Sequence, residues 1–443
     1  MRIVRIAFLL GCIIAVVGIA VTAWLALAPG ATGFAGESPV LLADYRGVAP
    51  TGVPASLAKA PLLVRGEYLT RAADCAACHT AKGGRPFSGG RAFKLPFGTL
   101  YTPNITPDVA TGIGRYTDAE FLKAVHKGVS RSGQPLYPAF PYSAYTMMTD
   151  ADVLAIKAYL FSLAPVTSTA PANTLGFPFN QRWLMTIWGV LFNSDKRFEP
   201  VPERSAQWNR GAYLVEAAGH CGDCHSPRNP MQAVDQRQKF AGGAAEGWTA
   251  YNITGDRLTG VGAWSRAELA AYLSTGHASG RGTASGPMGE VVELSLRHLT
   301  SEDIDAIVTY IRTIPAIHSA GLPDRLAGPA PAVHTAGFDQ NPRGKAIFEG
   351  NCASCHAWDG SGALIAEAQL TGSRAVNDPA ATNAAQMILS GAGHANSGRP
   401  YMPSFAAAYT DTEIAAVANY VGARFGAPSK VTATQVKVMR GES

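Results

Sequence analysis

The chain has 443 residues, which is enough for about three domains of typical size. Charged residues make up only 16% of it and hydrophobic residues 47%, a balance that suggests a surface partly covered by a membrane or by partner subunits. The formal net charge is +5, and no cluster of basic residues marks a nucleic-acid-binding surface, so this class of function is excluded.

An apolar run of 23 uncharged residues, 6–28, lies near the start of the chain. As a helix it would span about 35 Å, enough to cross a bilayer. Arg2 and Arg5 precede the run, and the next basic residue is Arg46, so the positive-inside rule places the amino terminus in the cytoplasm. The sequence therefore predicts an uncleaved membrane anchor; a signal peptide cut after Ala28 is the alternative.

Three copies of the motif Cys-x-x-Cys-His follow. In a c-type haem attachment site the two thiols bond covalently to the haem and the histidine binds its iron. Structural zinc is the alternative, but tetrahedral zinc needs four protein ligands and each copy supplies three. The sequence therefore predicts three covalently bound haem c groups. The predicted attachment residues and proximal iron ligands are Cys75, Cys78, Cys221, Cys224, Cys352 and Cys355, and His79, His225 and His356.

Each motif lies inside a longer repeat. An arginine-glycine pair upstream belongs to a short predicted helix, and a threonine downstream, followed three residues later by an acid, predicts the start of a last helix. We expect the first and last helices of each unit to cross, because the glycine permits close approach of the two backbones. The glycines and threonines are Gly66, Gly211 and Gly344, and Thr149, Thr300 and Thr410.

The first two units share a block that the third unit lacks. Asn104-Ile105-Thr106 with Thr111-Gly112-Ile113-Gly114 matches Asn252-Ile253-Thr254 with Thr259-Gly260-Val261-Gly262. This similarity indicates an internal duplication. We expect the Asn-Ile-Thr triplets to shape a loop over the haem edge.

These patterns predict an all-α fold, with three cytochrome-c-type haem domains in tandem after an amino-terminal transmembrane helix. The expected divisions are an anchor over 1–35, a linker over 36–60, domain 1 over 61–166, a linker over 167–207, domain 2 over 208–316, a linker over 317–335, domain 3 over 336–426 and a tail over 427–443.

One methionine in each unit is the candidate for the sixth iron ligand: Met148, Met288 and Met402. Met288 and Met402 stand beside prolines in stretches that precede the last helix. The choice in unit one is between Met148 and its neighbour Met147, and we favour Met148 because it directly precedes the predicted cap. Tyr137-Pro138-Ala139-Phe140 resembles residues 401–405 but contains no methionine.

The chain resembles the tri-haem cytochrome c subunits of bacterial membrane-bound dehydrogenases that oxidise alcohols, aldehydes or gluconate. The resemblance rests on the three motifs, the Asn-Ile-Thr blocks and three further stretches, 178–182, 286–292 and 401–403. It implies a subunit without catalytic residues of its own. Such a subunit passes electrons from a catalytic partner of flavin, quinoprotein or molybdenum type, with a possible small subunit, to ubiquinone in the inner membrane. Its haem domains would lie on the periplasmic side. Gln369 stands where the family often has proline.

Two alternatives stay open: a stand-alone membrane-anchored electron carrier to a terminal oxidase, and a haem peroxidase-like enzyme. A peroxidase needs an open or displaceable sixth iron position, whereas each unit here offers a methionine. The sequence also contains no dinucleotide-binding fingerprint and no nucleophile motif. We therefore expect that the isolated chain oxidises no alcohol, aldehyde or sugar.

The linker between the first two units carries an apolar, aromatic segment, 177–192, that is too short to span a bilayer. Trp183 and Trp188 suit a membrane interface, so we hypothesise that this segment touches the bilayer or a partner. Ordinary packing against the haem domains is the alternative.

Overall fold

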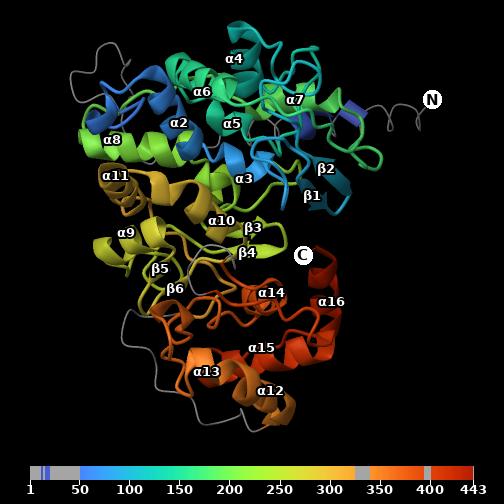
Figure 1. The fold of residues 1–443 in the computed structure, drawn as a ribbon, viewed down its shortest axis with the longest axis vertical. Helices are drawn as coiled ribbons and strands as arrows, with labels where there is room; N and C mark the ends of the chain where they lie inside the picture. The colour runs from blue at the N-terminus through green and yellow to red at the C-terminus, as the bar shows by residue number, and fades with distance from the viewer. Residues whose placement is uncertain (1–10, 13–14, 20–49, 325–339, 394–400, 443) are drawn as a thin grey trace.

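The computed structural model describes residues 11–12, 15–19, 50–324, 340–393 and 401–442. Three units, each containing one Cys-x-x-Cys-His motif, follow one another down the long axis of the molecule, from blue and green at the top to orange and red at the bottom (Figure 1). We call residues 61–166 unit one, 206–316 unit two and 340–426 unit three.

Helices form most of the regular structure in these described ranges. Unit one contains α2 Leu62–Ala72, α3 Cys75–His79, α4 Asp118–Lys127, α5 Tyr142–Tyr145 and α6 Asp150–Ser162, and the linker after it contains α7 Leu184–Phe192. Unit two contains α8 Ala206–Ala212, which continues as a π-helical turn over Tyr213–Ala218, then α9 Arg266–Thr275, α10 Gly286–Leu294 and α11 Ser301–Ile311. Unit three contains α12 Pro342–Ile347, α13 Ala353–His356, α14 Thr382–Ser390 and α15 Asp411–Phe425, and α16 Ala433–Glu442 follows it.

The prediction of an all-α fold is wrong, because the described residues include three antiparallel two-stranded sheets. Their strands are β1 Ala92–Leu95 with β2 Gly98–Tyr101, β3 Gly243–Ala245 with β4 Trp248–Ala250, and β5 His277–Ala278 with β6 Gly282–Thr283. At the turn between β3 and β4, Glu246 and Gly247 both have positive φ, as a type I′ hairpin requires. Strands of two to four residues are too short to give an alternating sequence pattern.

The expected crossing of first and last helices is confirmed in all three units. A side chain at Gly66 of α2 would collide with the carbonyl of Ala155 in α6. Gly211 stands in the same relation to Ala306 of α11, and Gly344 to Ala416 of α15. Only glycine permits this distance between the helix backbones.

The predicted starts of the last helices are also confirmed. The side chains of Thr149, Thr300 and Thr410 each accept a hydrogen bond from the backbone N–H three residues later, at Asp152, Asp303 and Glu413 respectively. Such a cap satisfies one of the N–H groups that a helix leaves unpaired at its amino end.

Units one and two are not separate domains. One hydrophobic core contains buried residues of both, among them Leu69 and Ile156 from unit one and Leu214 and Ile307 from unit two. Unit three has clusters of its own. The prediction of three haem domains in tandem is therefore wrong, because the first two units share one core.

Reciprocal hydrogen bonds join these two units. The hydroxyl of Tyr68 in α2 donates to the Asp303 carboxylate in α11 at 2.6 Å, and the hydroxyl of Tyr213, at the equivalent place after α8, donates to Asp152 in α6. Arg210 also donates to both oxygens of Asp303, at 2.8 and 2.7 Å. In units one and two, the acid at the start of the last helix therefore accepts a hydrogen bond from a tyrosine of the other unit.

The predicted transmembrane helix over residues 6–28 has no support in the structure. In the described ranges, no helix combines the length and the apolar character needed to cross a membrane. Residues 11–12 and 15–19 are helical, and the rest of the predicted segment lies outside the described residues.

The aromatic segment of the first linker packs on one side only. Trp188 of α7 is buried and donates its indole N–H to the carbonyl of Met231 at 2.9 Å, and its ring lies edge-on to Tyr142. Trp183 and Val190 are 61% and 80% exposed. Trp188 therefore shows the ordinary packing that we gave as the alternative. The other side of the segment is an apolar face that nothing in the described ranges covers.

Candidate functional site

The Cys-x-x-Cys-His motifs form single helical turns that bring two thiols and one imidazole to the same place. The first motif is α3, the second begins as a 3-10 turn over Cys221–Asp223, and the third lies at the end of a π-helical turn and in α13. None of these cysteines is in a disulfide. Both thiols of each motif are therefore free to form thioether bonds to one haem.

The three motif histidines share one orientation. Nδ1 of His79 is 2.8 Å from the carbonyl oxygen of Pro103, Nδ1 of His225 is 2.7 Å from that of Tyr251, and Nδ1 of His356 is 2.6 Å from that of Ala368. A carbonyl can only accept, so Nδ1 carries the proton and Nε2 keeps its lone pair. This is the arrangement that fixes a histidine for metal binding through Nε2.

Two β-hairpins deliver the first two of these carbonyls. Pro103 lies two residues after β2 and Tyr251 directly after β4, and an Asn-Ile-Thr triplet follows each. Asn252 Nδ2 donates to the carbonyl of Ile317 at 2.6 Å, and its Oδ1 accepts from the N–H of Thr254 at 2.8 Å. Asn104 makes the matching bonds in unit one. The triplets therefore hold the loop that orients the proximal histidine.

Unit three reaches the same result by another route. Ala368, at the end of a 3-10 turn over Ala366–Ala368, provides the carbonyl, and Gln369 follows it. Gln369 instead accepts a hydrogen bond from the N–H of Gly280 in unit two at 2.9 Å. The side chain at the place of the family proline therefore links unit three to unit two.

Burial sets the electrostatics of the motif residues. It lowers the pKa of His79, His225 and His356, so these imidazoles are neutral at pH 7, the form that binds iron. It also raises the pKa of Cys75 and Cys221 to about 12. A reactive redox thiol needs a lowered pKa, so the environment argues against thiol-disulfide exchange.

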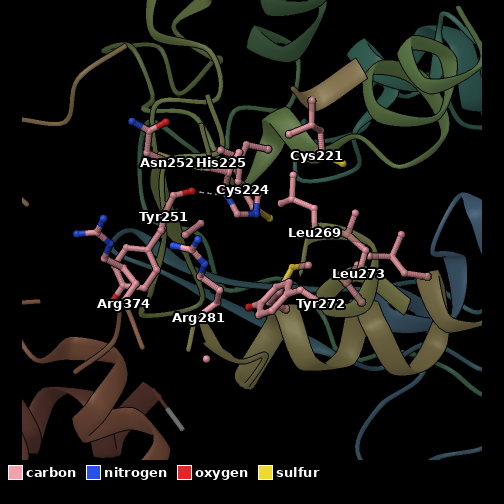
Figure 2. Close-up of a pocket in the computed structure, with 18 of the residues that line it drawn as sticks. Cys221, Cys224, His225, Tyr251, Asn252, Leu269, Tyr272, Leu273, Arg281 and Arg374 are labelled. Atoms are coloured by element: carbon pink, nitrogen blue, oxygen red, sulfur yellow. Dashed lines mark hydrogen bonds between the residues drawn. The ribbon is translucent and has the colours of Figure 1, made fainter. Parts of the chain in front are cut away.

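A cavity lies beside the second motif. Figure 2 shows Cys221, Cys224 and His225 on one side, facing Leu269 and Leu273 of α9. Met288, in the first turn of α10, also lines it. An apolar cavity with two thiols, a neutral imidazole and a thioether on its walls fits a covalently bound haem.

Both other units contribute to the walls of this cavity. Ala72 and Asp74, just before the first motif, line it from unit one, and Arg374 and Met387 line it from unit three. Tyr251, whose carbonyl binds His225, donates its hydroxyl to Asp378 of unit three at 3.1 Å. The second site is therefore in contact with residues of units one and three.

The predicted distal methionines occupy different environments. Met148 is fully buried in the core shared by units one and two. Met402 is half-buried, and its backbone pairs with Ala392 at the edge of the undescribed stretch 394–400. Only Met288 is placed by a described cavity beside its motif histidine. All three stay predictions.

Sequence reasoning missed a charged cluster between the first two motifs. Arg91 donates to the carbonyl of Ala77, inside the first motif, at 2.7 Å, and to Glu290 at 2.5 Å and Glu246 at 2.9 Å. Glu290 belongs to α10, the helix of Met288. The pairs with the two acids join residues 155 and 199 positions apart, so no local pattern could indicate them.

Comparisons with known proteins extend over most of this chain. A family model described as cytochrome c matches residues 63–164 and 342–423, the stretches of the first and third motifs. One of the subunits of nicotinate dehydrogenase from Pseudomonas putida is 42% identical over 87% of this chain, which spans only 32% of that protein's length. The gluconate 2-dehydrogenase cytochrome c subunit of Pantoea cypripedii is 37% identical, over 84% of this chain and 88% of that protein. The fructose dehydrogenase cytochrome subunit of Gluconobacter japonicus is also 37% identical, over 88% and 85%.

Proposed function

The chain belongs to the family of cytochrome c subunits of dehydrogenase complexes, and we propose that it passes electrons to ubiquinone. The electrons would come from a catalytic subunit that oxidises an alcohol or an aldehyde. Membership of the family confirms the resemblance seen in the sequence. It also confirms that the chain is an electron-transfer subunit with covalently bound haem c rather than the oxidising enzyme.

We propose three haems per chain. The family model covers the first and third motifs only. The observation that supports a haem at the second motif is its histidine, whose Nδ1 binds a carbonyl as in the other two, beside a cavity lined by Met288. The proposed ligands are the six motif cysteines and three motif histidines, with Met288 and Met402 on the distal sides of the second and third haems.

A haem held at each of these sites would supply one-electron redox chemistry. The protein's part is to hold the three sites in series: residues just before the first motif and residues of unit three both line the cavity of the second. This contact is the observation that carries the proposed function, because electrons can then cross from one end of the chain to the other through site two.

The proposed location is the periplasmic side of the inner membrane, with a catalytic subunit of flavin, quinoprotein or molybdenum type as partner. Covalent haem attachment in bacteria takes place on that side. Pull-down of the tagged chain, with identification of the subunit retained and its cofactor, tests the partner. A retained alcohol- or aldehyde-oxidising subunit whose turnover reduces ubiquinone supports the proposal. A haem-loaded chain that retains no dehydrogenase subunit contradicts it.

A further inference from the structure

Backbone hydrogen bonds align unit one with unit two residue by residue on the distal side. The middle helices, α4 and α9, both end at a glycine with positive φ, Gly128 and Gly276. Eight residues later a backbone N–H returns to that glycine's carbonyl: Leu136 to Gly128 at 2.6 Å, and Ala284 to Gly276 at 2.7 Å. The two loops between them have the same length, so their register is fixed.

This register places Phe140 where unit two has Met288, since each stands four residues after the returning N–H. The Phe140 ring is half-buried and packs 5.5 Å from the ring of Tyr145. A phenyl ring has no lone pair to offer to iron. The segment that carries the distal thioether in unit two therefore cannot carry it in unit one.

A second register point lies just before the last helices. Met148 precedes the cap Thr149, and its N–H donates to the carbonyl three residues back at 2.9 Å; Leu299 precedes the cap Thr300 and makes the same bond at 3.1 Å. Leu299 lines the cavity beside Cys221, Cys224 and His225. Unit one therefore has a thioether at a position that lines the cavity in unit two.

The turn that carries Met148 lies against the first motif. The hydroxyl of Tyr145, three residues earlier, donates to the carbonyl of Ala73 at 2.6 Å, two residues before Cys75. The side chain of Met148 is fully buried, and Cys75 packs against the same core. Met147 is half-buried, and its carbonyl accepts the N–H of Phe198 at 2.9 Å.

We propose that the first haem takes its distal ligand from Met148, and so from a different segment of the chain than the second haem. The two units exchange residue types at the two aligned positions. Unit two has Met288 and Leu299 there, and unit one has Phe140 and Met148. Nothing else in unit one supplies a thioether, apart from Met147. The proposal rests on the proposed function, because it needs a haem bound at Cys75 and Cys78.

The test uses the full-length chain carrying its haems, in four forms: wild type, Met148→Leu, Met147→Leu, and the double variant Phe140→Met with Met148→Leu. Leucine is the residue of unit two at this position and conserves volume, so folding is preserved. Haem content per chain is measured by mass. Distal ligation is measured by the ferric iron-sulfur charge-transfer band and by carbon monoxide binding to the ferrous protein.

In Met148→Leu, we expect full haem content, loss of about a third of the charge-transfer band and binding of one carbon monoxide per chain beyond the wild-type value. Met147→Leu should match wild type. The double variant should regain the band and lose the added carbon monoxide site, because it recreates the arrangement of unit two in unit one.

An unchanged band and no added carbon monoxide site in Met148→Leu would overturn the proposal, and so would a wild-type first haem that already binds carbon monoxide. The same changes in Met147→Leu alone would assign the ligand to that residue and also overturn it. Absence of haem at Cys75 and Cys78 in the wild-type chain would instead contradict the proposed function.

Discussion

At the scale of single residues, each motif histidine depends on a backbone carbonyl. Pro103, Tyr251 and Ala368 share no side-chain chemistry, so the sequence cannot reveal that the backbone carbonyl of each binds Nδ1 of a motif histidine. The cysteines and histidines were predictable because covalent attachment demands those residue types at that spacing. Asp152 and Asp303 were recognised as the acids three residues after the capping threonines, and their buried bonds to tyrosines of the other unit were missed.

Asn252→Ala should destabilise the protein by about 2 kcal/mol, because it leaves the N–H of Thr254 without its side-chain partner and removes the 2.6 Å bond to the carbonyl of Ile317. That carbonyl keeps only the longer bond from the Thr254 hydroxyl, at 3.2 Å. The loop that orients His225 should loosen with it, so the potential of the second haem should shift as well. Urea unfolding and a redox titration measure the two effects. Asn180→Ala, at an exposed position, is the control. Equal stability of the two variants would show that the triplet does not hold this loop.

The stability of the protein should fall as the pH drops from 6.5 towards 4, in part because of His126. Burial lowers the pKa of this histidine from 6.5 to about 4, with a smaller contribution from Arg197. Between these values the unfolded chain binds a proton that the folded chain does not, so unfolding is favoured there; above pH 6.5 the effect is absent. His126→Asn should flatten the denaturation curve over this window. An equally steep curve in the variant would assign the loss to other groups.

At the scale of elements, the crossing helices followed from their glycines, whereas the hairpins did not follow from any pattern. β1 to β4 have three or four residues each and flank the loops that hold Pro103 and Tyr251. Glu246 and Gly247 form the turn between β3 and β4 with positive φ at both residues, but the sequence shows only one glycine there, which does not by itself indicate a hairpin. The helical periodicity of the longer segments led to the prediction of an all-α fold, because these short strands give no pattern of their own.

Gly211→Ala should destabilise unit two by about 1–3 kcal/mol, because the added methyl group would collide with the carbonyl of Ala306. Gly189→Ala in α7 is the matched control, since nothing lies within 4 Å of the added atom there. The control should be neutral or slightly stabilising. Thermal unfolding of both variants decides the matter, and an equal effect at the two glycines would refute the close crossing of α8 and α11.

Replacing the two tryptophans of the aromatic segment should change the free energy of unfolding to very different extents. Trp188→Ala should cost about 3–5 kcal/mol, because the ring is buried against Tyr142 and hydrogen-bonded to Met231. Trp183→Ala, at an exposed ring, should change the free energy of unfolding by no more than about 0.5 kcal/mol. Urea unfolding of the two variants gives both values. A large loss in Trp183→Ala would show that this face packs against the rest of the chain.

At the scale of the whole molecule, units one and two form a pseudo-symmetric pair, and unit three attaches to it. The duplication was visible in the sequence, but the shared core was not, because Tyr68 and Asp303 lie 235 residues apart. Unit three has Ala346 where the others have this tyrosine, so it lacks the donor for such a bond. Its ties to unit two, through Asp378 and Gln369, surround the second site instead.

The central claim is that three haem sites in series carry electrons from a dehydrogenase to ubiquinone. Anaerobic reduction of the purified complex by its organic substrate, followed by addition of a ubiquinone analogue, tests it most directly. The account predicts that the substrate reduces three haems per chain to the ferrous state, as followed by their absorbance, and that the quinone returns all three to the ferric state. Reduction of fewer than three haems, or haems that stay ferrous in the presence of the quinone, would contradict it.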